Sequence, residues 1–383
     1  MKPILLLAIF LLNVQNLYPQ RIIYSDSIPK QTLRIVPNHI YGGLVSQNLS
    51  EIEYFELESD KDNLVGSIIS RLFTKNRILL IDSPNGNLYI FNRNGKLLKK
   101  INAIEGFKKP NKILFYRVQL ENEKFVAYGP NIRIVYDENG NEIEKEINYN
   151  FSYKNSTLLM DSTLYEYGDP QAYMEKSNND FALKMNNNIL IKYNSEDTID
   201  TFLEQGIPIV SNSNKSAYVV YPTTYNIFEL NSKGITKNIK IIFPLINTID
   251  TSEFYIYKNP SILKDYLNKF PDKIFGIGSP ILYGNYLIVK LKNFKYPDWI
   301  AINLENYKVL SLNKILPDKS NDFLPFIDLS YLNTDGEYLY SIIYPIDVFK
   351  AIDEGQKEGH KMRKEYMNLQ KSKNPIVVRF KLK

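Results

Sequence analysis

The segment LYIFNRNGKLLKKI (88–101) is the strongest indication of the fold of this chain. Two apolar runs flank the dipeptide Asn94-Gly95, and charge is confined to the turn and the tail. An Asn-Gly pair readily adopts the positive φ angles of a tight turn, and the flanking runs suit β-strands. The stretch therefore predicts a β-hairpin. The fold depends on whether this hairpin is single or is one copy of a repeat.

The same order of apolar run, turn, second apolar run and turn recurs along the chain. Five copies occupy 77–101, 124–147, 181–203, 217–241 and 285–312, and a sixth is split between 337–344 and 375–383. Each copy supplies two central strands and an outer strand, and the segment before the next copy has room for a fourth. Six such units favour an all-β fold, a six-bladed β-propeller of four-stranded antiparallel blades. A seventh blade would require 51–73 to form more than a closing segment.

The strand composition agrees with stacked blades. Continuous apolar runs occur at ILLI (78–81), LYIF (88–91), YVVY (218–221) and YLIV (286–289). In a sheet with one solvent-exposed face, apolar and polar residues alternate along each strand. Continuous apolar runs therefore indicate strands that are covered on both faces. A β-sandwich needs only about 100 residues for seven strands. This chain of 383 residues would have to contain several sandwiches, and one closed ring is simpler.

The N-terminus predicts export. Residues 1–20 combine Lys2 with the nine-residue apolar run from Ile4 to Leu12, as a secretory signal peptide does. A spanning helix needs about 20 apolar residues, so we expect no membrane-spanning segment in the mature chain. We expect the protein in the periplasm, at the outer-membrane periphery or outside the cell. Because the chain has no cysteine to acylate, it is not expected to be a lipoprotein.

The remaining chain divides into a short linker and the propeller. We assign 21–50 to an N-terminal linker and 51–383 to the propeller, with helical insertions near 259–270 and 347–373. A propeller ring commonly closes by pairing strands from both chain ends in one blade. We therefore expect the strand at 51–57, or one soon after it, to complete the blade that holds the C-terminal strand. The insertion at 347–373 is either a solvated excursion or a helix that covers a site or docks a partner.

The run ELESDKDNLVGSIISRLFTKNRILLIDSPNGNLYIFNRNGKLLKKI (56–101) resembles six-bladed β-propeller proteins exported by Bacteroidetes-type bacteria. The marks are Leu-Val-Gly-Ser-Ile at 64–68, the Ile-Asp strand end at 81–82, and the phenylalanine strand that leads into Asn-Gly-Lys. The end of the chain, NPIVVRFKLK (374–383), is similar to that family's closing strand. A related family of uncharacterised propellers is similar too. The resemblance implies fold and export, and it implies no reaction.

One stretch departs from that family. Its members often carry Gly-Arg-Gly-Pro-Gly-Glu after the first hairpin, whereas this chain has IEGFKKPNK (104–112). The function of that loop in the family is therefore not carried over. The lysines of 95–112 suit a solvated sheet edge better than a polyanion patch. The net charge of +5 is mild for this length, and we expect no nucleic-acid partner.

Composition excludes several chemistries. With no cysteine and only His39 and His360, one chain cannot form a thiolate zinc site or a three-histidine metal site. No nucleophile motif occurs, and DENGNEIEKE (137–146) has its glycine at the wrong position for a calcium loop. We therefore expect no cofactor, no metal and no recognisable catalytic residue. Four acids near strand ends or turns keep a carboxylate pair open, namely Asp82, Asp169, Asp298 and Asp335.

Aromatic residues are the most suggestive binding feature. Tyr-Pro follows the first strand at comparable points of three repeats, in YPTTY (221–225), KYPDW (295–299) and YP (344–345). If these turns share one face, the mouth of the channel would carry aromatic rings that suit sugars and peptides. The candidate binding residues are Tyr221, Tyr296, Trp299 and Tyr344. Packed turn tyrosines are the structural alternative.

The sequence favours a binding or interaction protein over an enzyme. We expect a monomeric exported β-propeller that binds a glycan, a peptide or an envelope protein. The alternative is a propeller-fold glycan hydrolase or lyase that uses paired carboxylates, and a structural subunit of a surface assembly is a third possibility. Two acids about 5 to 9.5 Å apart would favour glycan hydrolysis.

Overall fold

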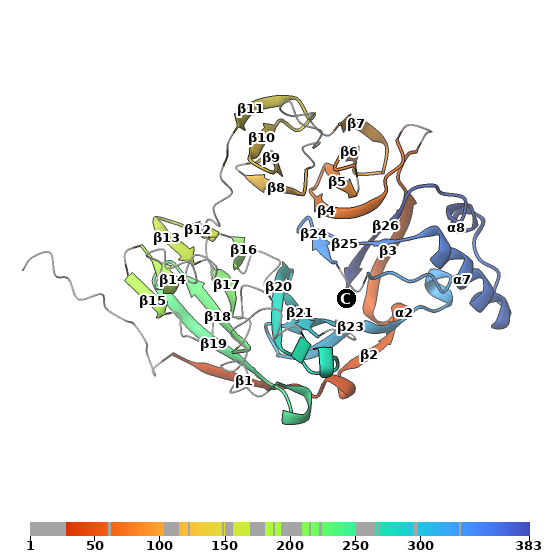
Figure 1. The fold of residues 1–383 in the computed structure, drawn as a ribbon. Helices are drawn as coiled ribbons and strands as arrows, with labels where there is room; N and C mark the ends of the chain where they lie inside the picture. Colours follow the sequence, from red (N-terminus) through yellow and green to blue (C-terminus); the bar gives the residue numbers. More distant parts are fainter. Residues whose placement is uncertain are drawn as a thin grey trace, which may run out of the picture. The chain divides into compact units, whose positions relative to one another are not determined.

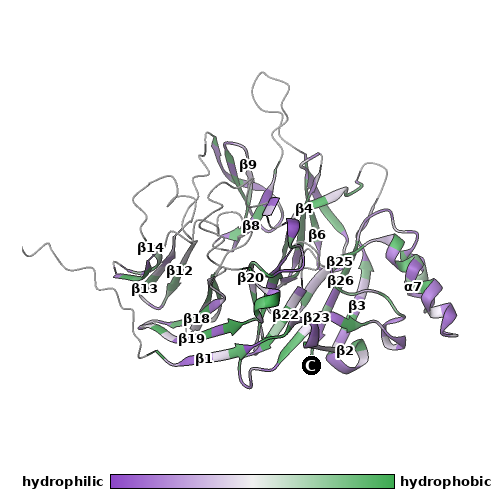
Figure 2. Cartoon of the chain, turned by 60° about the horizontal axis from the view of Figure 1, so that its bottom comes forward, coloured by the Kyte–Doolittle hydropathy of each residue, from purple (hydrophilic) through white to green (hydrophobic). Residues whose placement is uncertain are grey.

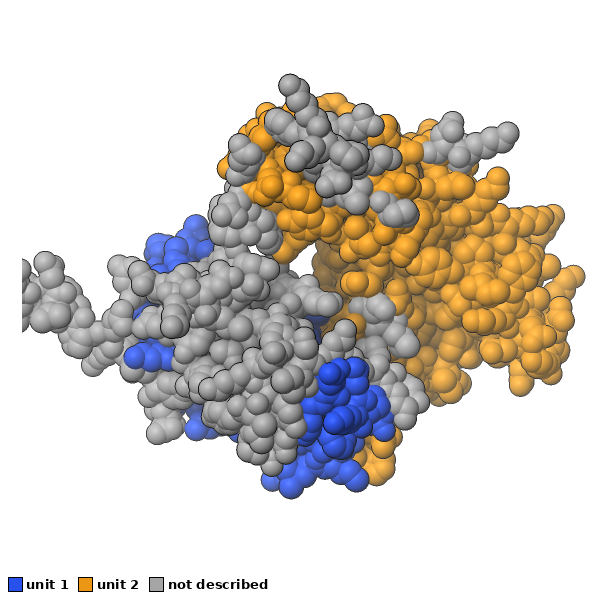
Figure 3. Space-filling model, in the orientation of Figure 1, with its two compact units in different colours: residues 1–35, 153–280, 292–294 blue, residues 36–152, 281–291, 295–383 orange. Residues whose placement is uncertain are grey.

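In a computed structural model of the chain, most strands form antiparallel hairpins (Figure 1). The structure describes residues 28–59, 63–83, 85–102, 115–121, 123–147, 149, 156–168, 181–186, 188–192, 209–213, 216–221, 224–249, 265–266, 268–293, 298–328 and 331–383. Contact clustering divides the chain into two compact units. Unit 1 comprises 1–35, 153–280 and 292–294, and unit 2 comprises 36–152, 281–291 and 295–383 (Figure 3).

The described residues form six sheets, and each contains strands of one predicted repeat. Blades 1 and 2 are four-stranded and lie in unit 2. Blade 1 contains β4 (Ser67–Phe73), β5 (Arg77–Ser83), β6 (Leu88–Asn92) and β7 (Leu97–Ile101), and blade 2 contains β8 (Arg117–Glu121), β9 (Lys124–Gly129), β10 (Ile132–Tyr136) and β11 (Glu142–Ile147). The hairpin at 88–101 is thus β6 and β7, the third and fourth strands of blade 1.

Blades 3 and 4 belong to unit 1. Blade 3 contains β12 (Ser156–Met160), β13 (Thr163–Tyr167), β14 (Phe181–Met185) and β15 (Asn188–Lys192), and blade 4 contains β16 (Ile209–Ser213), β17 (Ser216–Tyr221), β18 (Asn226–Asn231), β19 (Gly234–Ile242) and β1 (Lys30–Arg34). Buried residues of both blades share one apolar cluster, which includes Tyr165, Leu183, Val219 and Leu230.

Blade 5 is five-stranded, and blade 6 is formed by both ends of the chain. Blade 5 contains β20 (Gly276–Tyr283), β21 (Tyr286–Lys292), β22 (Asp298–Asn303), β23 (Val309–Leu316) and β2 (Tyr41–Leu44), and blade 6 contains β24 (Asn333–Thr334), β25 (Leu339–Ile343), β26 (Ile376–Leu382) and β3 (Leu49–Glu56). The strand β3 pairs antiparallel with the C-terminal β26, with Glu56 opposite Ile376. This pairing confirms the prediction that a strand at 51–57 completes the blade that holds the C-terminal strand.

The range 21–50, which the sequence predicts as a linker, contains strands of the sheets. The strand β1 pairs parallel with β19, and β2 pairs parallel with β23. Blades 4 and 5 therefore have a fifth, parallel outer strand in addition to the four antiparallel strands expected. A 3-10 turn η1 (Pro37–His39) lies between β1 and β2, and a short helix α2 (Val45–Asn48) lies between β2 and β3.

The insertion after β25 forms two helices. The helix α7 (Pro345–Lys357) ends before Gly359, which has a φ of +66°, and α8 (Lys364–Leu369) follows. Hydrophobic and hydrophilic residues alternate along α7 (Figure 2), and Val348 and Ala351 are buried against blades 5 and 6. The insertion expected near 259–270 lies largely outside the described residues. Two further 3-10 turns are η3 (Leu245–Asn247) and η4 (Lys319–Asn321).

Candidate functional site

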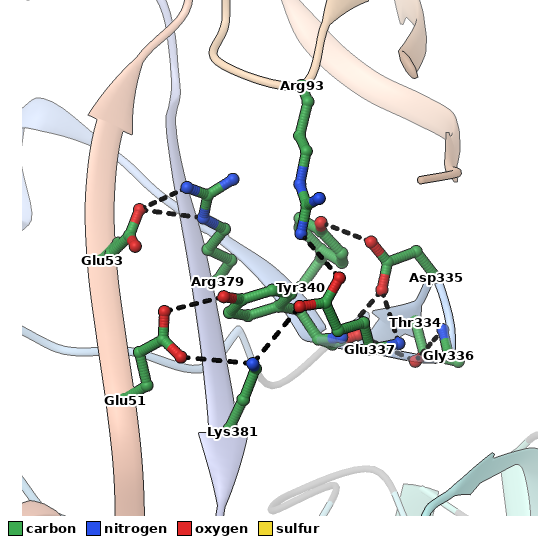
Figure 4. Close-up of polar contacts among 11 residues, drawn as sticks. Glu51, Glu53, Arg93, Thr334, Asp335, Gly336, Glu337, Tyr340, Arg379 and Lys381 are labelled. Carbon is green, nitrogen blue, oxygen red and sulfur yellow. Dashed lines mark hydrogen bonds and ion pairs between the residues drawn. The ribbon is translucent and has the colours of Figure 1, made fainter. Parts of the chain in front are cut away.

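A network of ion pairs among the described residues of unit 2 lies on blade 6 (Figure 4). Glu53 of β3 lies opposite Arg379 of β26, and Glu51 lies opposite Lys381. Arg379 donates through Nε and Nη2 to Oε2 of Glu53, at 2.9 and 2.5 Å. The Nζ atom of Lys381 lies 3.3 Å from a carboxylate oxygen of Glu51. These pairs align the two ends of the chain in one sheet.

Tyr338 lies at the centre of this network. Its ring centroid is 4.2 Å from Nζ of Lys381, 5.2 Å from Cζ of Arg93 and 5.3 Å from Cζ of Arg379. Its hydroxyl donates to Glu51 at 2.7 Å, and this hydrogen bond lowers the pKa of that carboxyl. Arg93 reaches Glu337 at 3.0 Å from the turn between β6 and β7. Because each of the three cations has a carboxylate partner, the network is best explained as a structural clasp.

The acids singled out from the sequence are held by local hydrogen bonds. Asp82 is fully buried and accepts from the Asn87 backbone N–H at 2.8 Å. Asp335 accepts from the N–H groups of its own turn and from the Tyr340 hydroxyl at 2.8 Å. Both oxygens of Asp298 accept from Ser311 Oγ, at 2.9 and 3.0 Å. Asp169 lies outside the described residues.

Asp298 is the acid with the most altered protonation. Burial raises its pKa to about 6, against the opposing effect of the Ser311 hydrogen bond. Such a value would suit a general acid, but a glycosidase needs a second carboxylate across the scissile bond. Among the described residues, no cluster of three or more metal-binding side chains occurs either. The hydrogen bonds of Asp298 to Ser311 instead join β22 to β23 within blade 5.

Arg71 of β4 differs from the other cations. Its side chain is only 9% exposed, and the nearest carboxylate oxygen, Oδ2 of Asp328, lies 3.8 Å from Nη1. That distance is too long for a hydrogen bond. In the described part of the chain, neither Nε nor Nη1 of Arg71 has a hydrogen-bond acceptor. The guanidinium is thus charged, largely buried and without an acceptor at two of its nitrogens.

Aromatic side chains surround this guanidinium. Its Cζ lies 4.0 Å from the ring centroid of Tyr331, a stacked cation–π geometry. Tyr344 lies near enough that the charges of Arg71 and Asp328 both act on its pKa, although burial is the larger cause of its increase. Tyr331 and Tyr344 are each 42% exposed. The two rings are therefore accessible from solvent while the guanidinium is not.

Blade 5 contributes a second cation and an indole. Lys290 Nζ lies 6.0 Å from the ring centroid of Tyr331 and 5.6 Å from that of Trp299. The Trp299 ring is 2% exposed, and its Nε1 has no acceptor among the described residues. We call Arg71, Asp328, Tyr331, Tyr344, Lys290 and Trp299 the arginine site. With two cations and one carboxylate it carries one net positive charge.

Desolvation is the main electrostatic cost at this site. Burial lowers the pKa of Arg71, while the nearby Asp328 carboxylate acts in the opposite direction. An arginine keeps its charge even so, because its ordinary pKa is above 12. A buried charged donor without an acceptor costs on the order of 1–3 kcal/mol or more. The arrangement is thus suited to an anionic or acceptor-rich ligand.

The aromatic residues predicted from the sequence have different surroundings. Trp299 and Tyr344 both belong to the arginine site. Tyr221 ends β17 in unit 1, where it is 4% exposed and packs in the core of blades 3 and 4. Tyr296 lies outside the described residues. Two of the four residues therefore lie in one cluster of unit 2, together with cations that the sequence did not indicate.

Two comparisons with known proteins concern the fold. Residues 30–268 match the profile of a family described as a 6-bladed beta-propeller, DUF5128. A solved structure from Bacteroides fragilis NCTC 9343, whose description proposes an exported protein, aligns with a TM-score of 0.63 and 15% identity. The alignment covers 92% of this chain and 99% of that one. At this identity the likeness concerns the fold alone.

Other solved structures are less similar. A member of the duf4221 family from Bacteroides vulgatus has a TM-score of 0.41 and 9% identity, over 88% of this chain and 97% of its own. A streptogramin B lyase has a TM-score of 0.40 and 10% identity, over 88% and 99%. At these scores neither match bears on function. No curated protein matches the chain. Among the described residues, no helix is long and apolar enough to cross a membrane.

Proposed function

Because the chain belongs to the DUF5128 family of six-bladed β-propellers, we propose that it is an exported binding protein whose ligand sits at the arginine site. The observation that carries the proposal is Arg71, a nearly buried guanidinium with two nitrogens that lack acceptors, next to two half-exposed tyrosines. Ligand sites typically combine apolar or aromatic walls with a few placed polar groups. The leader-like N-terminus and the neighbour described as exported support location outside the cytoplasm.

The ligand is a glycan, a peptide or an exposed segment of an envelope protein. A screen of glycan and peptide libraries against the chain lacking residues 1–20 tests this function. For any compound that binds, calorimetry should show at least a tenfold loss of affinity in Arg71→Met. The matched control is Arg34→Met, which replaces an exposed arginine of β1 in the other unit and should leave affinity unchanged. Ligands that bind both variants equally would show that Arg71 is not part of the binding site. A screen that finds no ligand would argue against a binding role.

A glycan hydrolase or lyase is the alternative function. Asp298 favours it, since burial raises the pKa of this carboxyl to about 6. Release of new reducing or unsaturated ends from mixed polysaccharides, lost in Asp298→Asn, would support the alternative. Equal release of such ends by the unaltered chain and by the variant would show that Asp298 is not catalytic.

A further inference from the structure

The outer edge of blade 2 is an exposed strand without a neighbour. Figure 1 shows β11 as the last strand of this sheet, next to β10. All six of its residues, from Glu142 to Ile147, are exposed. About half of the backbone N–H and C=O groups of such an edge strand point away from the sheet. In the part of the chain that the structure describes, these outward groups of β11 make no hydrogen bond.

The outer edges of two other blades already hold an added strand. In blade 4, β1 pairs parallel with β19, and in blade 5, β2 pairs parallel with β23. Both added strands are short, and Leu33 is the only buried residue of β1. Main-chain hydrogen bonds are therefore the main contact that such a strand makes. The fold accepts a short parallel strand at the outer edge of a blade, and β11 offers an edge of the same kind.

The charge of this edge limits which strand can pair with it. Residues 137–147 contain five acids and one lysine, a net charge of −4 in a chain whose own net charge is +5. Arg133 of β10 lies 3.3 Å from a carboxylate oxygen of Glu144. Among the described residues, neither Glu142 nor Glu146 has an ion pair. Two carboxylates of the edge are therefore left for cations of a partner.

Charged residues commonly protect an edge strand from pairing. On β11 this protection is selective, because all but one of its charged residues are acidic. Two copies of β11 side by side would bring glutamates together, and like charges directly opposite each other destabilise a strand pair. A segment with Lys or Arg at alternate positions would instead face these carboxylates. Ile143 and Ile147, which are 49% and 46% exposed, would contact its apolar side chains.

We propose that the outer edge of β11 binds an extended basic segment of a partner protein as a fifth, parallel strand of blade 2. Main-chain hydrogen bonds hold the segment, and Glu142 and Glu146 select its lysine or arginine side chains. This surface includes no residue of the arginine site. The two proposals are therefore independent, and the failure of one leaves the other unchanged.

Synthetic peptides test the charge preference. The chain lacking residues 1–20 retains every described residue. It is titrated by fluorescence anisotropy with labelled Thr-Lys-Val-Lys-Val-Lys-Thr, blocked at both ends, and with the same peptide carrying Glu in place of Lys. The lysine peptide should bind at least about tenfold more tightly than the glutamate peptide, because the edge is acidic. Equal affinities would overturn the proposal, as would a lysine peptide that does not bind.

Two N-methylated forms of the lysine peptide separate strand pairing from attraction of charge alone. One form is methylated on the backbone nitrogens of two lysines, and the other on those of the two valines. Alternate residues of a strand direct their N–H groups towards the same neighbour, so only one form loses hydrogen bonds to β11. That form should lose at least about tenfold in affinity, while the other binds nearly as well. Equal affinities of the two forms would overturn strand addition.

Protein variants test whether the peptide binds at β11. Glu142→Gln/Glu146→Gln should weaken the lysine peptide about tenfold, because both unpaired carboxylates are removed. The matched control is Glu354→Gln/Glu358→Gln, which alters two exposed glutamates of the helical insertion and should leave affinity unchanged. The bound peptide should also slow amide hydrogen exchange in β11. Equal affinity for both double variants, or slower exchange only outside β11, would overturn the assignment to this edge.

Discussion

At the residue scale, the same hydrogen-bonded turn recurs in several hairpins of unit 2, with an Asn or Asp side chain that accepts from backbone N–H groups of the turn. The side chain of Asn92 accepts from the N–H groups of Asn94 and Lys96, at 3.0 and 2.9 Å. Asp137 makes the same pair of bonds in blade 2, and Asn303 makes a closely related pair in blade 5. Such side-chain bonds to the following backbone fix a turn locally. The turn of the hairpin at 88–101 is therefore stabilised by the side chain of Asn92 as well as by the backbone conformation of Asn94-Gly95.

Gly95 is required for two separate reasons. Its φ is +84°, and a Cβ placed on it would lie 2.4 Å from the carbonyl oxygen of Glu56 on β3. We expect Gly95→Ala to lower the free energy of unfolding by about 2 to 4 kcal/mol, because backbone strain and a backbone clash add. Urea denaturation measures the loss.

The matched control for this change is Gly336→Ala. Gly336 has a φ of +89°, but nothing lies within 4 Å of its added Cβ. That variant should show only the strain of a left-handed alanine, about 1 kcal/mol. Equal losses in both variants would mean that the contact between the Gly95 turn and β3 contributes nothing.

Asp298 gives unit 2 an unusual pH dependence. Its pKa is raised from 3.8 to about 6 by burial, so ionisation opposes folding. Stability from this group is full below about pH 4 and falls as the pH rises to about 6. Above pH 6 the cost is complete, about 2 to 3 kcal/mol.

Replacing Asp298 should remove this dependence. We expect Asp298→Asn to be more stable than the unaltered chain at pH 8 by about 2 kcal/mol, and nearly equal to it at pH 4. Urea denaturation at both values checks this expectation. Asp161→Asn, in an exposed turn, should change stability by less than about 0.5 kcal/mol at either pH. A gain that is independent of pH would show that the pKa of Asp298 is the same in the folded and the unfolded chain, so that burial does not raise it.

At the element scale, a buried aspartate fastens the helical insertion to blade 5. Asp322 follows η4, is 2% exposed and has a φ of +55°. Its carboxylate lies 2.6 Å from Nε2 of His360 and accepts from Nε of Arg363 at 2.5 Å. Both partners belong to the connection between α7 and α8. One carboxylate therefore holds the turn of a helical hairpin.

We expect Asp322→Asn to loosen the two helices locally. Asparagine tolerates the left-handed backbone, so the change removes the charge and leaves the turn intact. Amide hydrogen exchange in α8 and at the end of α7 should accelerate at least tenfold, while blades 1 and 2 keep their protection. The control is Asp353→Asn, which removes an exposed pair with Lys357 and should change exchange little. Unchanged exchange in α8 would mean that apolar packing alone holds the helices.

How far the sequence predicted each element depends on how local its determinants are. The hairpin β6–β7 was evident because turn residues and continuous apolar strands are adjacent in the chain. The strands β1 and β2 were missed, since KQTLR and YGGL carry no comparable run and depend on partners beyond residue 230. Of the arginine site, the sequence indicated Trp299 and Tyr344 but not the charged residues. Arg71 stands in SIISRLF, an ordinary strand sequence, and its surroundings come from three blades.

At the scale of the whole molecule, blade 6 joins a strand near the start of the chain, β3, to the C-terminal strand β26. The two strands contact each other through buried residues and through the clasp of Figure 4. The chain contains no cysteine, so a disulfide can be introduced without competing thiols. Positions 53 and 379 are direct partners in the ladder.

We expect the disulfide of Glu53→Cys/Arg379→Cys to stabilise the folded chain. It would close a very long loop, for which chain entropy predicts about 6 kcal/mol relative to the reduced form. The measurement compares urea midpoints of the oxidised and reduced forms of the same variant, so the lost ion pair cancels. Equal midpoints would contradict the expectation and indicate that strain in the folded state cancels the effect of the disulfide on the unfolded chain.

The three N-terminal strands impose an order on folding. Each forms the outer edge of a sheet whose other strands come much later in the chain: Leu33 pairs with Ile241, Tyr41 with Leu310 and Glu53 with Arg379. During synthesis these strands emerge first and find their partners last. Such long-range pairing makes folding slow and leaves strand-forming segments exposed in the meantime. The nascent chain is therefore an expected client of chaperones until its final residues have emerged.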